Sequence, residues 1–139
     1  MKKLLSTALF LFLVAALMAQ VQSGLVRRLN SNKSPIPGVY IKFEDAKGDI
    51  SDTQGKFVLR FEGKKPGQLL FKKEIFKDGY ELVNEKDFEL IKLSDTDQLG
   101  VDVILAEAGT VDAAKKEYYN VSEEALLAGF NREKKELRD

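Results

Sequence analysis

Apolar and polar residues alternate in two segments in the first half of the chain, residues 39–44 and 56–62, with Val58 as an exception. Successive side chains of a β-strand point to opposite faces, so this period of two predicts two strands that each bury one face. Residues 99–106 alternate in the same way. The residues that we expect these three strands to place in the core are Val39, Ile41, Phe43, Phe57, Leu59, Phe61, Val101 and Val103.

Weaker strand patterns surround these segments. The first covers residues 20–29, where Val21 and Leu25 have one phase and Val26 has the other. Further candidate strands are 49–51, 68–73, 80–83 and 87–93. The apolar residues of 87–93 change phase, which indicates a bulge or a strand that crosses to a second surface.

Turn-forming residues separate these strands. Residues 30–38 contain Pro35 and Pro37, which cannot donate to a β-ladder, and residues 62–67 and 77–79 are rich in glycine and charged residues. No amphipathic helix pattern lies between the strands. Short strands joined by turns predict a mainly β protein, an antiparallel sandwich of about seven strands, rather than βαβ units.

The pattern changes at Gly109. Residues 110–139 lack the alternation and are rich in Ala, Glu and Lys, which predicts one or two helices. Asp112 and Ser122 are the expected N-terminal caps, because their side chains can accept hydrogen bonds from free backbone N–H groups.

A narrow apolar stripe runs along the end of this helical tail. Leu126, Phe130 and Leu137 share one helical face, with Leu127 beside it. The polar face is wide, so we expect the stripe to lie against a partner or against further sequence that would follow Asp139. Packing on the sandwich is the alternative.

The N-terminal segment is typical of an export signal. Lys2 and Lys3 precede an almost wholly apolar run, residues 4–17, and Ala16 and Ala19 suit a cleavage site after Ala19. A retained membrane anchor is the alternative, but the run is short for a span, which needs about 20 residues. The expected organisation is a signal peptide at 1–19, a β-sandwich at 20–107 and a helical tail at 108–139. We therefore expect a periplasmic, outer-envelope or secreted protein without a stable transmembrane anchor.

The composition of the chain excludes several kinds of covalent link and catalytic group. The chain has 139 residues, no cysteine and no histidine, so disulfides, a lipid on cysteine and the commonest general base are all excluded. Basic and acidic residues are equal in number and interspersed, which argues against nucleic-acid binding. Because the chain has no cysteine, burial of apolar surface must stabilise the fold without disulfides.

Four elements in residues 23–83 resemble the carboxypeptidase regulatory-like domain, a transthyretin-like β-sandwich. They are Ser-Gly-Leu-Val at 23–26, Ser-Pro-Ile-Pro-Gly-Val-Tyr-Ile at 34–41, Ser-Asp-Thr-Gln-Gly-Lys-Phe-Val-Leu at 51–59 and Lys-Asp-Gly-Tyr-Glu at 77–81. The family's Gly-Thr-x-x-Gly-Thr run is absent, and residues 45–49 stand in its place. The tail at 116–127 also resembles charged helices that precede helical repeats in bacterial envelope proteins. These resemblances imply a non-catalytic accessory domain in an envelope or secreted protein.

Two groups of acidic residues are candidates for metal binding or catalysis. Asp45, Asp49 and Asp52 could supply oxygen ligands to calcium, but the order of an EF-hand loop is absent and aspartate is common in turns. Asp95 and Asp97 lie in one polar turn, whereas glycosidase carboxylates face each other across a cleft. We expect no catalytic, metal or cofactor-binding residues and no cofactor.

The tail contains two features with alternative interpretations. Tyr118 and Tyr119 could stack on a sugar, but we expect them to pack the helix on the sheet because paired aromatics bury large areas. Asn120-Val121-Ser122 fits a glycosylation sequon and is interpreted as a loop before a helix cap.

We therefore expect a non-enzymatic structural or interaction module of the bacterial cell envelope, its sandwich acting as a rigid binding platform for a protein or glycan. A carbohydrate-binding module, or an accessory domain of a larger envelope protein or enzyme, is the alternative.

Overall fold

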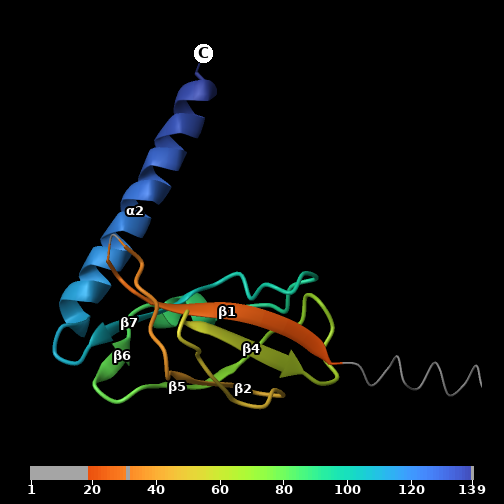
Figure 1. The fold of residues 1–139 in the computed structure, drawn as a ribbon. Coiled ribbons are helices and arrows are strands. Elements are labelled where there is room, and N and C mark those ends of the chain that lie inside the picture. Colours follow the sequence, from red (N-terminus) through yellow and green to blue (C-terminus); the bar gives the residue numbers. More distant parts are fainter. Residues whose placement is uncertain (1–18, 31, 139) are drawn as a thin grey trace, which may run out of the picture.

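The described residues form two β-sheets followed by one long helix (Figure 1). The computed structural model describes residues 19–30 and 32–138, with the backbone alone at 121–123. The predicted leader, residues 1–19, lies outside the described residues except for Ala19. The elements are β1 (Gln20–Arg28), β2 (Tyr40–Phe43), β3 (Asp49–Ile50), β4 (Lys56–Phe61), β5 (Lys72–Phe76), β6 (Tyr80–Leu82), the short helix η1 (Glu85–Phe88), β7 (Val103–Glu107) and α2 (Val111–Glu136).

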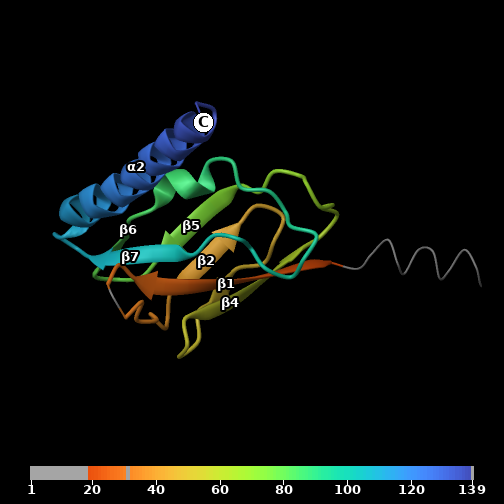
Figure 2. The ribbon, with the colours of Figure 1, turned by 90° about the horizontal axis from the view of Figure 1, so that it is seen from above.

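The larger sheet has four strands in the order β4-β1-β7-β6, and the smaller has three in the order β3-β2-β5. Every strand pair is antiparallel except β1 with β7, which pair in parallel from Val26 with Val103 to Arg28 with Leu105. In the view of Figure 1, β2 and β5 lie below β1 and β4, and Figure 2 shows the same strands from above, with α2 on the side of β6 and β7. The predicted strand-rich, mostly antiparallel fold with a C-terminal helix is confirmed.

The two sheets share one hydrophobic core. Phe43 of β2 and Phe61 of β4 meet edge to face, with ring centroids 6.1 Å apart, and Phe43 also contacts Phe88 of η1. Of the eight predicted core residues, Val101 is only partly buried and packs at the margin of the core. The other seven are fully buried, so the alternation identified the core correctly.

Strand β1 buries the phase that contains Val26, whereas Leu25 of the opposite phase is exposed. Gln22 lies on the buried face and is fully covered. Its amide donates to the carbonyls of Val21 and Thr96 at 2.9 and 2.8 Å and accepts from the backbone N–H of Ser94 at 3.1 Å. The loop after η1 therefore covers β1 and is held there by Gln22, whose side-chain hydrogen bonds are all made. The apolar pattern alone did not reveal this buried polar residue.

Three predicted strands needed correction. The segment 68–73 enters a strand only at Lys72, which begins β5. The segment 87–93 is not a strand: η1 ends at Phe88, and the following residues form an isolated bridge between Lys92 and Leu69. The apolar phase of 87–93 changes because a helical turn, not a bulge, places Phe88 in the core.

In the third of these segments, 99–106, the strand begins only at Val103. Gly100 has a φ of 81°, a left-handed conformation that interrupts extended backbone.

The tail forms a single helix. It begins at Val111 after Gly109, whose φ is 90°, and Thr110 is the residue before the first turn. The predicted caps are wrong: Asp112 lies inside the first turn, and Ser122 lies within the helix. Among the described residues, no helix combines the length and hydrophobicity needed to cross a bilayer.

Candidate functional site

Helix α2 has two parts with different surroundings. Its docked part, residues 111–120, lies beside β7 and includes several half-buried side chains. Its projecting part, which we define as residues 124–136 of the helix together with residues 137 and 138 just after its end, has only exposed side chains. Figure 1 shows this second part rising away from both sheets.

The two tyrosines hold the docked part on the body formed by residues 20–107. Their rings meet edge to face at 5.2 Å between centroids. The Tyr118 hydroxyl donates to the Asp87 carboxylate. Tyr119 has longer contacts: its hydroxyl oxygen is 3.4 Å from the backbone nitrogen of Lys86, and the Lys86 ammonium lies 5.0 Å from its ring centroid. The tyrosines therefore pack the helix on the body as expected, but their contacts are with η1 and the carbonyl of Val83 rather than with the sheet that the sequence predicted.

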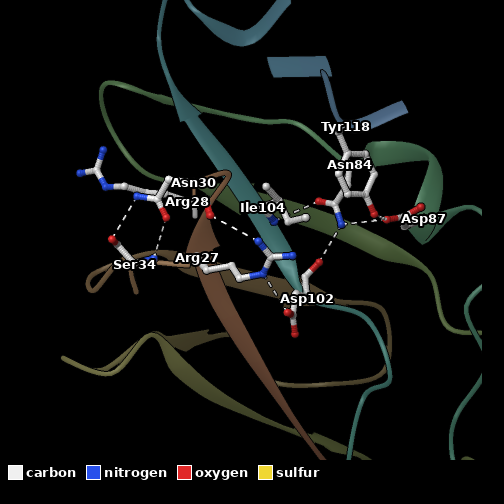
Figure 3. A network of polar contacts seen from close by, with 9 residues as sticks. All are labelled: Arg27, Arg28, Asn30, Ser34, Asn84, Asp87, Asp102, Ile104 and Tyr118. Atoms are coloured by element: carbon white, nitrogen blue, oxygen red, sulfur yellow. Dashed lines mark hydrogen bonds and ion pairs between the residues drawn. The ribbon is translucent and has the colours of Figure 1, made fainter. Parts of the chain in front are cut away.

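A buried asparagine organises the surface on which the helix docks (Figure 3). Asn84 is fully buried, and its oxygen accepts from the backbone N–H of Ile104 at 3.0 Å. Its amide nitrogen donates to the carbonyl of Asp102 at 2.7 Å and to the Asp87 carboxylate at 3.0 Å. Asn84 therefore joins β7, η1 and, through Asp87, the hydroxyl of Tyr118.

Burial and the hydrogen bond to Asp87 raise the pKa of Tyr118 to about 12. At neutral pH this side chain is a neutral phenol that donates its proton to Asp87. It is a poor general base, because its anion is disfavoured by both desolvation and the nearby carboxylate.

Two arginines of β1 complete the polar surface near α2. Arg27 forms an ion pair with Asp102 at 3.0 Å, and Arg28 forms one with Glu107 at 3.0 Å. The hydrogen bond to Glu107 is the main cause that raises the pKa of Arg28. Throughout the described residues, every buried side-chain nitrogen or oxygen has a hydrogen-bond partner. The buried polar side chains of this network are therefore occupied by hydrogen bonds that join β1, β7, η1 and α2.

The projecting part of α2 carries the predicted apolar stripe. Leu126, Phe130 and Leu137 are 73%, 65% and 88% exposed. Leu126 and Phe130 are about one turn apart, and Leu137 follows Phe130 by about two turns, so the three share a face. Tyr119 falls on the same face about two turns before Leu126. The stripe therefore lies in line with Tyr119, one of the residues by which α2 docks, but it covers no part of its own body.

The predicted calcium ligands have separate structural partners. Asp49 accepts from the backbone N–H of Val58 at 2.7 Å and so links β3 to β4. Asp52 accepts from the backbone N–H groups of Gln54 and Lys56 within its own turn. Asp45 is paired with Lys64 at 3.5 Å. In the described part of the chain, no group of three or more acidic side chains is placed to hold a metal ion.

The remaining candidate motifs are also structural. Asp97 lies in the loop that covers Gln22, where its carbonyl accepts from the backbone N–H of Ser23 at 2.6 Å, and Asp95 is an exposed residue of the same loop. The sequon at 120–122 lies inside α2, so its interpretation as a loop before a cap is wrong.

Two open clefts flank the docked part of α2. One, of about 440 Å³, is lined by Asn84, Asp87, Asp102 and Tyr118, which the network above already uses. The other, of about 300 Å³, lies between β7 and the first turns of the helix. Neither cleft combines a nucleophile with a base that activates it.

Sequence reasoning missed one surface. Tyr40 of β2 pairs with Ile50 of β3 on one side and with Phe76 of β5 on the other. Ile50 and Phe76 are exposed, so an apolar row crosses the outer face of the three-stranded sheet. The signal was the position of Tyr40 opposite the core phase of its strand, but its cross-strand neighbours could not be identified without the register.

Comparison with known proteins produced no match to this chain among family models, curated proteins or solved structures.

Proposed function

We propose that this protein is a non-enzymatic, exported interaction module of the bacterial cell envelope. Its body acts as a rigid platform, and the projecting part of α2 is the contact element. We further propose that the body is a seven-stranded transthyretin-like sandwich of the carboxypeptidase regulatory-like type.

One observation carries the functional proposal: the apolar stripe on residues 124–138 is exposed, while every buried polar side-chain atom of the described residues already has a hydrogen-bond partner. Large exposed apolar side chains gathered on one face mark an interaction surface. The network at Asn84 and Tyr118 fixes the direction of the helix, which is what a presenting element requires.

The order of elements supports the proposed family. Gly24 lies in β1, Val39 directly precedes β2, and the Thr53–Gly55 turn leads into β4. Gly55 has a φ of 75°, and a Cβ there would lie 2.3 Å from the carbonyl oxygen of Val26, so this turn needs glycine.

Site-specific photo-crosslinking in the producing cell tests the proposed role. A photoreactive residue at position 130 should form a discrete adduct, whereas one at Leu90, an exposed apolar residue of the body, should not. Equal labelling at both positions, or none at 130, would contradict the proposal. N-terminal sequencing of the exported protein checks the leader, with Gln20 expected first.

A second candidate function, carbohydrate binding, is favoured by the row Ile50–Tyr40–Phe76. Aromatic rings on a flat sheet face can stack on sugar rings. A glycan array with the Phe76→Ala variant as control tests it, and binding that survives this substitution would exclude the row as the site. Tyr118 and Tyr119 no longer support this function, since their rings and hydroxyls are used in docking.

A further inference from the structure

We propose that the projecting part of α2 pairs with the same segment of a second copy of this chain, in antiparallel orientation. This inference rests on the proposed function, because it names the partner of the same surface. Four features of residues 117–138 lead to it. They are the exposure of the apolar stripe, the spacing of its residues, the separation of acidic from basic residues along the helix, and the position of Gly129.

The projecting part lacks what normally stabilises a helix in a protein. Most helical stability comes from packing of an apolar face, and isolated helices of about 15 residues are marginal in water. Here every described side chain from Glu124 to Arg138 is exposed, and Gly129 lowers helix propensity further. A helix of this composition needs a surface that covers Leu126 and Phe130.

The stripe complements itself when two copies run in opposite directions. With the two-fold axis level with residue 128, Leu126 of each copy lies opposite Phe130 of the other. Leu137 then reaches the level of Tyr119 of the second copy, where that helix meets its own body. The proposed contact therefore reaches Tyr119, at the edge of the face that docks α2.

Charge along the helix selects the antiparallel orientation. Between residues 117 and 131 the charged residues are all acidic, whereas basic residues outnumber acidic ones from Arg132 to Arg138. An antiparallel pair places the acidic segment of one copy beside the basic segment of the other. A parallel pair would place the two acidic segments side by side and the two basic segments side by side, and repulsion between like charges would destabilise it.

Gly129 allows the two helices to approach closely. It lies next to the stripe, and no neighbouring atom lies within 4 Å of where its Cβ would be. The distance between packed helices depends on the size of the side chains at the contact. A residue without a side chain beside Phe130 leaves room for the ring from the second copy.

Analytical ultracentrifugation of the purified protein tests the pairing. We expect a dimer whose population rises with concentration in the micromolar range, and Phe130→Ala should raise its dissociation constant at least about tenfold. Leu90→Ala removes a similarly exposed side chain from the body and should leave the constant within about twofold. A monomer at every concentration would overturn the proposal. Circular dichroism and melting temperature confirm that each variant is folded.

Cysteine cross-linking tests the orientation, since the chain has no cysteine of its own. Under mild oxidation the double variant Leu126→Cys/Phe130→Cys should give a disulfide-linked dimer. Leu137→Cys should not, because its two copies would lie near opposite ends of the pair. Ala128→Cys, on the opposite helical face, is the matched control. Efficient linkage through Leu137→Cys would overturn the antiparallel arrangement.

These results separate the two proposals. If the purified protein stays monomeric while position 130 links to a different protein in the cell, self-pairing is wrong and the interaction role stands. If position 130 links to nothing and the protein is monomeric, both proposals fail.

Discussion

The ring of Phe57 in β4 lies directly over the backbone of Gly24 in β1, its partner in the strand register. A Cβ on Gly24 would be 2.3 Å from the Cζ atom of Phe57, well inside van der Waals contact. The two residues thus form one packing unit, in which the missing side chain of one makes room for the ring of the other.

Gly24→Ala should lower the free energy of unfolding by about 1–3 kcal/mol, because the ring must move within a packed core. Urea denaturation measures the change. The same substitution in a Phe57→Ala background should cost much less, since the obstructing ring is gone. Additive losses in the double variant would contradict the proposed coupling.

Phe57→Ala should itself cost about 3–5 kcal/mol, since this side chain is only 1% exposed and its removal leaves a cavity. Thermal and urea unfolding measure the loss. The neighbouring Val58→Ala, on the outer face of the same strand, should cost less than about 1 kcal/mol. Similar losses at the two positions would show that the core lies elsewhere.

Asn84→Ala should destabilise the protein by about 1–3 kcal/mol, because it leaves the buried N–H of Ile104 without its partner. The substitution also frees Asp87, so hydrogen exchange should rise in the first turns of α2. Asn30→Ala provides a matched control at an exposed asparagine whose partner is Ser34 in the same turn. Unchanged exchange in α2 would argue against the link through Asp87.

Tyr118 should make stability fall at alkaline pH. Its pKa is about 12 in the folded protein and about 10 in an unfolded chain, so the folded state holds the proton more tightly. The resulting stabilisation is complete below pH 10 and is lost as the pH rises through 12.

Denaturation at pH 9 and pH 12 measures this loss, and Tyr118→Phe should make it smaller. Absorbance of the tyrosinate, followed through an alkaline titration, should lose its latest-titrating component in the same variant. The control is Tyr40→Phe, on the outer face of the three-stranded sheet. If the latest-titrating tyrosinate component persists in Tyr118→Phe, that component does not belong to Tyr118, and the hydrogen bond to Asp87 does not hold the phenol neutral.

The alternation of residues was enough to identify most of the core. Phe57, Leu59 and Phe61 are buried in β4 because a strand with one covered face must carry apolar side chains at every second position. The pairing of Tyr118 with Tyr119 likewise predicted docking of the helix. Both signals are local, so they can be read without knowing which strands are neighbours.

The polar residues of the core were not predictable in this way. Gln22 and Asn84 are buried because their hydrogen-bond partners, at Ser94 and Ile104, come from distant parts of the chain. Without those partners, burial of an amide would be unfavourable, and a sequence pattern assigns such residues to the surface.

Strand content, the inward apolar phase of β2 and β4, and the apolar stripe of the tail follow from the residues alone, since each depends on periodicity within a few neighbours. The parallel pairing of β1 with β7, the helical turn at Phe88 and the exposure of that stripe follow only from the three-dimensional arrangement. Contacts between segments far apart in the chain decide which surfaces are covered, and local periodicity carries no record of those contacts.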